Sequence, residues 1–191
     1  MTQKRTTQGI DDQPPERESS RSEMVGVYRN RSYVPPELWI DPVRLAKRSI
    51  AVRVYAGLPF FETTAGLLRH LRSRADDGVE VRLLLGDPDS DAVAVRGREE
   101  KVDMAARVRH VLHFLAPVVE YPGIGIRLDT TTLYFSLYVF DDVMIVNPHM
   151  GGVPASMSPH LHLCRTRSNR IFDEYVNDFE TLCSRAAPFQ G

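Results

Sequence analysis

Apolar and polar residues follow two different rhythms along the chain, and together they predict alternating strands and helices. Residues 49–56 (SIAVRVYA) and 79–85 (VEVRLLL) are apolar runs rich in branched side chains, the pattern of strands buried on both faces. Residues 64–77 (TAGLLRHLRSRADD), which lie between them, instead place apolar side chains at helical spacing (Leu67, Leu68, Leu71, Ala75). A strand, a helix and a strand joined this closely predict a right-handed parallel βαβ unit.

The remaining sequence continues this alternation. A short helix is expected within 37–49, broken or restarted at Pro42, and a long helical region follows from about 92 to 119. Strand patterns then appear in IGIRLDT, in LYFSLYVF and VMIVNPH around the turn Asp141–Asp142, and in HLHLCRT, before a last helix at about 170–185. These elements predict an α/β fold, a single domain with a mixed sheet of about six strands and helices on both faces.

The composition of the chain indicates where the folded domain begins and which partners it can have. Residues 1–23 are almost all polar, so we expect a disordered tail ahead of a domain that spans 24–191. The formal net charge is −1 and no segment is strongly basic, which argues against direct binding to DNA. The lack of a long apolar run or a signal-peptide pattern indicates a cytoplasmic protein without a membrane partner. Cys164 and Cys183, which form no CxxC pair, are expected to be buried reduced thiols.

Several stretches resemble one known domain. They are GVYRNRSYVPPELW, VYAGL, GVEVRLLLGDPDSDAVAVRGREE, TTLYFSLYVFDD and IVNPHMGG. Residues 24–188 resemble the domain of unknown function that follows the helix-turn-helix in actinobacterial XRE-type transcriptional regulators. The resemblance implies a fold similar to one half of the phospholipase D superfamily. Here a polar tail stands where those regulators carry their DNA-binding module, and Val139 stands where the family has a basic residue.

The phospholipase D resemblance can be tested against that superfamily's motif, His-x-Lys, four residues, Asp, six residues, Gly-Ser. With Asp141 at the aspartate, Tyr134 falls at the histidine and Ser136 at the lysine, while Pro148 and His149 fall at Gly-Ser. Phosphodiester cleavage of this kind needs an imidazole nucleophile and a cation for the phosphate oxygens. A phenol and a hydroxyl supply neither at neutral pH, so the sequence predicts a degenerate motif without that chemistry.

Two acidic residues mark a first candidate site. Asp87 and Asp89 lie in the loop Gly86–Ser90, at the carboxyl end of a buried strand, where open α/β sheets bind ligands. Their carboxylates could accept hydrogen bonds from a hydroxylated or cationic ligand. The alternative is structural: Asp87 or Ser90 caps the next helix and Pro88 shapes the turn.

A second group of candidates lies further along the chain. Arg96, Arg98, Glu99 and Glu100 have the spacing of a solvated, salt-bridged helix face. Arg107 instead lies among apolar residues, so its head group is expected to need an internal partner such as Glu99, Asp103 or a ligand anion. Tyr134, Ser136 and Tyr138 alternate with Leu133, Phe135 and Leu137, which puts the hydroxyls on one strand face that we expect to line a cleft.

Asn147 and His149 end the second strand of the predicted hairpin. His149 could act as a general base or as a ligand contact, or it could be a loop histidine satisfied by backbone groups. His160 and His162 share a strand face and could ligate a metal together with His149 or an aspartate, but an HxH pair alone is a weak signal. We therefore predict neither a metal nor a cofactor.

The leading hypothesis is a non-catalytic regulatory module that binds a small-molecule effector or a partner regulator. Its expected ligand-binding residues are Asp87, Asp89, Arg107, Tyr134, Ser136, Asn147 and His149. Because phospholipase D motifs work in pairs, the resemblance also implies a homodimer. A second hypothesis is an enzyme with rebuilt acid–base chemistry on a phosphate- or nucleotide-containing substrate, using His149 and Asp141. A third is a truncated relic with a structural role.

Overall fold

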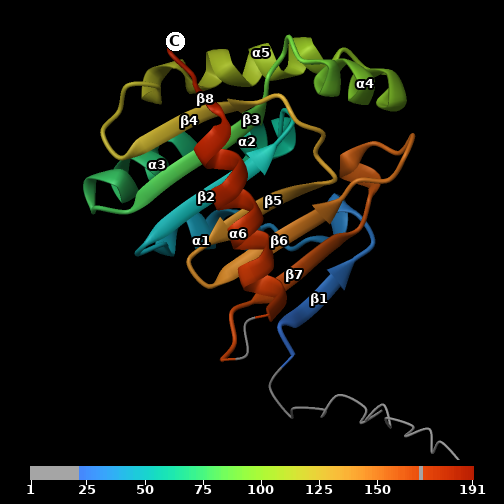
Figure 1. Cartoon of the computed structure of the whole chain (residues 1–191). Coiled ribbons are helices and arrows are strands. Elements are labelled where there is room, and N and C mark those ends of the chain that lie inside the picture. Colours follow the sequence, from blue (N-terminus) through green and yellow to red (C-terminus); the bar gives the residue numbers. More distant parts are fainter. Residues whose placement is uncertain (1–21, 168–169) are drawn as a thin grey trace, which may run out of the picture.

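The computed structural model describes residues 22–167 and 170–191, and one eight-stranded sheet runs through them (Figure 1). The strands lie in the order β1-β7-β6-β5-β2-β3-β4-β8. Only β2, β3 and β4 run parallel to one another, and every other neighbouring pair is antiparallel. The bounds are β1 Met24–Tyr28, β2 Ser49–Val54, β3 Glu80–Gly86, β4 Ile124–Asp129, β5 Phe135–Phe140, β6 Val143–Pro148, β7 His160–Cys164 and β8 Ala187–Pro188.

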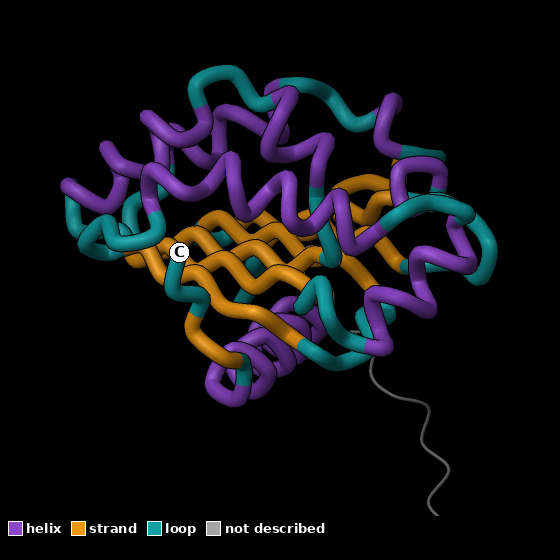
Figure 2. Tube along the Cα trace, turned by 90° about the horizontal axis from the view of Figure 1, so that it is seen from above, coloured by secondary structure: helices purple, strands orange, loops and turns teal. Residues whose placement is uncertain are grey.

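Helices cover both faces of this sheet, as predicted. On one face lie α1 (Glu37–Leu45), α2 (Leu58–Thr63), α3 (Leu67–Asp76), α4 (Asp91–Glu100) and α5 (Met104–Leu115), with the short 3-10 turns η1 (Arg31–Tyr33) and η2 (Ala116–Val118). On the other face α6 (Arg170–Arg185) crosses alone, as Figure 2 shows. A third 3-10 turn, η3 (Ala155–Met157), lies between β6 and β7.

The sheet therefore separates two hydrophobic cores. The larger core lies under the five helices, and the smaller one packs α6 against the sheet through Phe172, Phe179 and Cys183. The mostly apolar runs predicted as doubly buried strands form β2 and β3, whose side chains reach both cores. The parallel pairing of β2 with β3 and the antiparallel β5–β6 hairpin are confirmed.

The prediction of about six strands was too low, because both edge strands carry weak signals. The strand β1 (MVGVY) leaves Val25 and Val27 mostly exposed, so it lacks the apolar run of a central strand. At the opposite edge β8 is only two residues long and includes Pro188, a residue that sequence patterns assign to loops.

Three helix boundaries differ from the prediction. The region 92–119 divides into α4 and α5 at Lys101, whose backbone is left-handed (φ 57°), and Asp103 caps α5 by accepting a hydrogen bond from the Ala106 amide at 2.8 Å. The helix expected from residue 64 begins only at Leu67, after the separate helix α2. In contrast, α1 continues through Pro42 without a break.

Glu23, which its polarity assigned to the tail, belongs to the folded domain. Its carboxylate accepts hydrogen bonds from the amides of Ile171 and Phe172 at 2.9 and 3.0 Å, and it is only 9% exposed. It thereby satisfies two free N–H groups in the first turn of α6. Residues 1–21 of the predicted tail lie outside the described residues.

Two further expectations concern the thiols and the membrane. Both cysteines are free thiols, but only Cys183 is buried, while Cys164 is partly exposed at the end of β7. Within residues 22–167 and 170–191, no helix has both the length and the apolar character needed to cross a bilayer.

Candidate functional site

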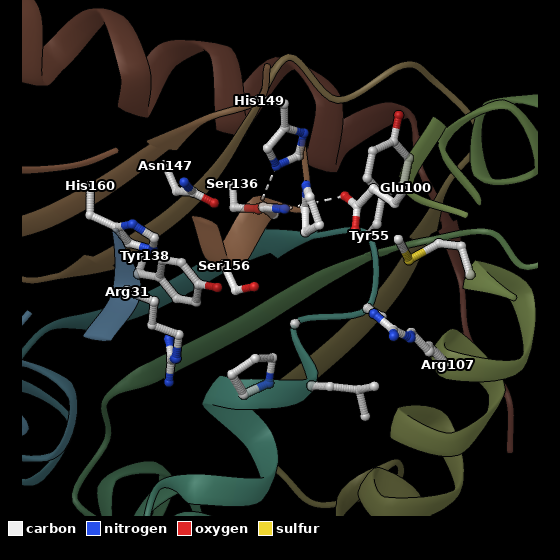
Figure 3. A pocket seen from close by; sticks show the side chains of 17 residues that line it. Arg31, Tyr55, Glu100, Arg107, Ser136, Tyr138, Asn147, His149, Ser156 and His160 are labelled. Atoms are coloured by element: carbon white, nitrogen blue, oxygen red, sulfur yellow. Dashed lines mark hydrogen bonds between the residues drawn. The ribbon is translucent and has the colours of Figure 1, made fainter. Parts of the chain in front are cut away.

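A pocket of about 100 Å³ opens beside the carboxyl end of β2, on the face of the sheet that carries five helices (Figure 3). One side of the pocket is lined by strand residues and by two residues that directly follow a strand: Ser136, Tyr138, Asn147 and His160 in the strands, and Tyr55 and His149 just past the ends of β2 and β6. Its walls come from the loop before α2, from α5, from η1 and from the segment 154–156. Segments far apart in the sequence thus meet at the edge where open α/β sheets bind ligands.

Ser136 and His149 form the central polar pair of this pocket. The Ser136 hydroxyl lies 2.9 Å from Nε2 of His149, and Nδ1 of the same ring lies 3.0 Å from the Leu133 carbonyl oxygen. A carbonyl only accepts, so Nδ1 must carry the proton, and the bare Nε2 accepts from Ser136. The Tyr55 ring stacks on the imidazole, with centroids 5.8 Å apart, and fixes its plane.

The two histidines that line the pocket are neutral near pH 7. Burial lowers the pKa of His149 to about 4, and the charge of Arg96 acts in the same direction. Burial likewise lowers the pKa of His160 to about 4, although its Nδ1 is satisfied by the Ser158 carbonyl at 3.0 Å. Both imidazoles therefore offer neutral hydrogen-bonding groups to a ligand.

Tyr138 closes the inner end of the pocket. Its ring packs edge-on against Trp39 at 5.1 Å and contacts Phe60 at 5.2 Å, which places it within the larger core. Complete burial raises the pKa of its hydroxyl to about 12, so the phenol remains protonated in any physiological buffer. Tyr138 can therefore donate a hydrogen bond into the pocket but cannot serve as a base.

One wall of the pocket is held in place by a buried ion pair on α4. Arg96 is 4% exposed, and its Nε lies 2.7 Å from Oε1 of Glu100. The same guanidinium donates to the carbonyls of Met150 and Val153, while Glu100 accepts from the Ala155 amide at 3.3 Å. The expectation of a solvated helix face was thus wrong for Arg96 and Glu100, which fasten the β6–β7 loop to α4.

Four of the predicted ligand-binding residues meet in this pocket. They are Arg107, Ser136, Asn147 and His149. The period of two correctly placed Ser136 and Tyr138 together, because Leu137 and Val139 point to the opposite core. The internal partner expected for Arg107 is absent: among the described residues its exposed side chain has no ion pair or hydrogen bond.

Asp87 and Asp89 do not reach the pocket. Asp87 accepts a hydrogen bond from the Asp89 amide at 2.9 Å, and its carbonyl accepts from the Ser90 amide and hydroxyl. Ser90 in turn caps α4 by accepting from the Val93 amide at 3.3 Å. Asp89 is exposed and pairs with Arg109 at 2.5 Å. This loop therefore fulfils the turn and capping role that was the alternative to ligand binding.

Tyr134 and Asp141 also lie outside the pocket. Tyr134 precedes β5, so the strand alternation does not govern it; it is 76% exposed beside a second hollow. Asp141 lies at the far end of β5 with a left-handed backbone (φ 52°) and accepts from the amides of Lys47, Arg48 and Ser49 at 2.7–2.9 Å. Burial alone would raise the pKa of Asp141, but these three donors outweigh it and lower that pKa. Asp141 and His149, the two residues named for the enzyme hypothesis, therefore do not share one pocket.

Sequence reasoning missed four polar pocket residues: Arg31, Tyr55, Glu100 and Ser156. Arg31 comes from a polar turn whose residue pattern gives no signal of a binding site, and Glu100 was assigned to a solvated helix face. Tyr55 ends a buried strand at the edge where ligands bind, and that position was a signal that could have identified it. Among residues 22–167 and 170–191, no three His, Cys, Asp or Glu side chains are placed to hold a metal ion, and His162 lies outside the pocket.

No protein-family model matches the sequence, and no curated protein matches it either. Solved structures do match. TrmBL2, an archaeal chromatin protein, superposes with a TM-score of 0.54 and 12% identity over 94% of this chain and 57% of its own length. NucT from Helicobacter pylori superposes with a TM-score of 0.50 and 11% identity, over 86% of this chain and 98% of NucT. Nuc from Salmonella typhimurium, a phospholipase D family member, superposes with a TM-score of 0.45 and 14% identity, over 81% of this chain and 90% of Nuc.

These likenesses concern the fold, because all the identities are low. The chain has a phospholipase D-like fold, which confirms the fold implied by the sequence resemblance, with eight strands in place of six. It spans 57% of the length of TrmBL2.

Proposed function

We propose that this chain is a ligand-binding module that holds a small molecule in the pocket around Ser136 and His149 and does not cleave phosphodiesters. The observation that carries the proposal is the pocket itself, in which neutral imidazole, hydroxyl and amide groups converge from several elements. In the register of the resemblance, the residues that would break a phosphate ester are replaced by Tyr134, which lies outside the pocket, and by Ser136.

A second candidate function has one specific observation in its favour. The Ser136 hydroxyl donates to a histidine nitrogen at 2.9 Å, the arrangement of an activated nucleophile and its base. The low pKa of His149 weighs against it. With a pKa of about 4, His149 has a low affinity for protons: at pH 7 only about one imidazole in a thousand holds one. It is therefore a weak base for removing the proton of a serine hydroxyl. Binding is therefore the better supported role.

The resemblance to the domain that follows the helix-turn-helix in XRE-type regulators supports a regulatory use of this binding. In this proposal, ligand occupancy changes how the module contacts a partner regulator, and a twofold homodimer presents two pockets. TrmBL2 is a DNA-binding chromatin protein, which makes DNA contact the competing role. The near-neutral charge of this chain favours a protein partner over DNA.

The experiment that tests binding is a thermal-shift screen of the full chain against nucleotides and small metabolites. We expect at least one compound to raise the melting temperature, and Ser156→Trp, which fills the pocket mouth, to abolish that shift. Ser73→Trp, on an exposed face of α3, is the matched control and should leave the shift unchanged. A shift that survives Ser156→Trp would contradict the assignment of the pocket.

The enzyme alternative is tested with the same preparations. Bis(4-nitrophenyl) phosphate and 4-nitrophenyl acetate report phosphodiester and ester cleavage, and we expect neither to be turned over. Turnover that disappears in both Ser136→Ala and His149→Ala would replace the binding proposal with the catalytic one.

A further inference from the structure

Arg31 differs from the other buried or half-buried arginines of residues 22–167 and 170–191 in what its guanidinium contacts. Five of those arginines pair with carboxylates: Arg53, Arg74, Arg82, Arg96 and Arg165. Two donate to backbone carbonyls: Arg72 and Arg127. Arg31 has neither partner. It has one long contact to the Thr63 hydroxyl at 3.4 Å, and its guanidinium lies over the Trp39 ring at 4.1 Å.

This arrangement is costly for the folded protein. A guanidinium withdrawn from water loses hydration, and proteins normally compensate with a counter-charge or a full set of acceptors. Burial accordingly lowers the pKa of Arg31, and the nearby Tyr138 only partly opposes that effect. An aromatic ring attracts a cation, but it offers no hydrogen-bond acceptor in the plane of the guanidinium. The donors of Arg31 are therefore available to a ligand.

The rest of the pocket lining does not provide the missing negative charge. Glu100 is the only acid among the lining residues, and it is occupied by Arg96 at 2.7 Å and by the Ala155 amide. Arg107, on α5, adds a second guanidinium that has no partner among the described residues. Figure 3 shows Arg31 and Arg107 on opposite sides of the pocket, with Ser136 and His149 above them in this view. The lining therefore has an excess of positive charge.

We propose that the ligand of this pocket is a small molecule that bears an oxyanion, either a phosphate or a carboxylate. Arg31 binds the anionic group, and Arg107 adds positive charge from the opposite wall. This inference rests on the proposed function, because it names the class of molecule that the pocket binds. A guanidinium presents a planar pair of N–H donors that matches the two oxygens of either group. The neutral hydroxyls of Ser136 and Ser156 then bind the uncharged part of the ligand, and a cavity of about 100 Å³ limits that ligand to a small molecule.

The test is isothermal titration calorimetry of the full chain at low ionic strength with three probes. Inorganic phosphate and malate represent the two oxyanion chemistries, and glycerol is the neutral probe. We expect at least one anion to bind, and Arg31→Gln to weaken it by about tenfold or more. Arg31→Lys keeps the charge but loses the planar fork, so it should recover only part of the affinity.

The matched control is Arg29→Gln, which removes the same charge two residues earlier from an exposed position outside the pocket. It should change the affinity by much less than Arg31→Gln, because the Arg29 side chain is surrounded by water and does not line the pocket. Melting curves identify a folding defect: Arg31→Gln removes a cation without a counter-charge, so its melting temperature should equal or exceed that of the parent.

The outcomes separate this inference from the proposed function. Anion binding that is unchanged in Arg31→Gln would overturn the inference. The inference would also fall if the pocket bound neutral compounds but neither phosphate nor malate. In that case the proposed function would stand, provided that Ser156→Trp abolished the thermal shift caused by the neutral compounds. If neither class of compound bound, both proposals would fall. A preference for phosphate over malate, or the reverse, would identify which oxyanion the site selects.

Discussion

The hydroxyl of Ser136 lies 2.9 Å from Nε2 of His149, and the β5–β6 hairpin brings the two residues together. In that hairpin Ser136 is paired with Asn147, so His149 emerges just past the strand end on the same side of the sheet. The bond holds a neutral imidazole with a defined tautomer at the centre of the pocket. This relationship connects the stability of the protein, its pH dependence and its capacity to bind a ligand.

The stability of the protein should fall as the pH decreases from about 6.5 to 4. The folded-state pKa values of His149 and His160 are about 4, below the ordinary value of 6.5, so in this window the unfolded chain binds more protons. Each histidine should then cost ~1.4 kcal/mol per pH unit. Urea unfolding at pH 7 and at pH 5 measures the difference.

The contribution of His149 to that slope can be isolated. His149→Gln removes the titrating group, so the loss of stability between pH 7 and pH 5 should become smaller. His113→Gln, at an exposed position on α5, is the matched control and should keep the slope of the parent protein. An unchanged slope in His149→Gln would contradict a buried neutral imidazole.

Asp141→Ala should destabilise the fold without affecting the pocket. The substitution leaves the amides of Lys47, Arg48 and Ser49 without their acceptor and strains a left-handed backbone, for an expected loss of ~2–4 kcal/mol. Asp141→Asn, which keeps an acceptor and tolerates that backbone, should recover part of the loss. Ligand-induced thermal shifts should persist in both variants. A loss of ligand binding without a loss of stability would show that Asp141 belongs to the binding site.

Arg96→Met should loosen the β6–β7 loop. It leaves Glu100 as a buried unpaired carboxylate and frees two loop carbonyls, so we expect a loss of ~3–5 kcal/mol. The double variant Arg96→Met with Glu100→Met removes both charges and should recover much of that loss. Chemical unfolding measures the stability, and limited proteolysis near residue 152 reports the loop. Equal losses in the single and double variants would show that the ion pair does not hold this wall.

The isolated chain should not bind DNA tightly in a sequence-specific manner. Its formal net charge of −1 supplies no overall attraction to a phosphate backbone, and the exposed Arg44, Arg48 and Arg109 are each paired with an aspartate. An electrophoretic mobility assay at low and moderate salt checks this expectation. A tight shift that depends on DNA sequence would favour the role known for TrmBL2 over a partner-binding module.

The sequence by itself determined the central architecture. Short, mostly apolar runs rich in branched side chains favour central strands, so 49–56 and 79–85 predicted β2 and β3, and alternation around Asp141–Asp142 predicted the hairpin. The same alternation placed Ser136 on the face that lines the pocket. These signals are local, since each depends on which side of one element is buried, and one sequence segment is enough to reveal it.

The tertiary structure alone decided which polar residues share the pocket. Arg31 reaches it from a turn more than a hundred residues before Ser136, and Asp141, although close to Ser136 in sequence, lies at the other end of the same strand. The role of a charged side chain depends on the partners that surround it, as the contrast between Arg31 and the paired Arg96 shows. Those partners come from distant segments, so only the folded arrangement of the sheet and its helices reveals a charge that is still unpaired.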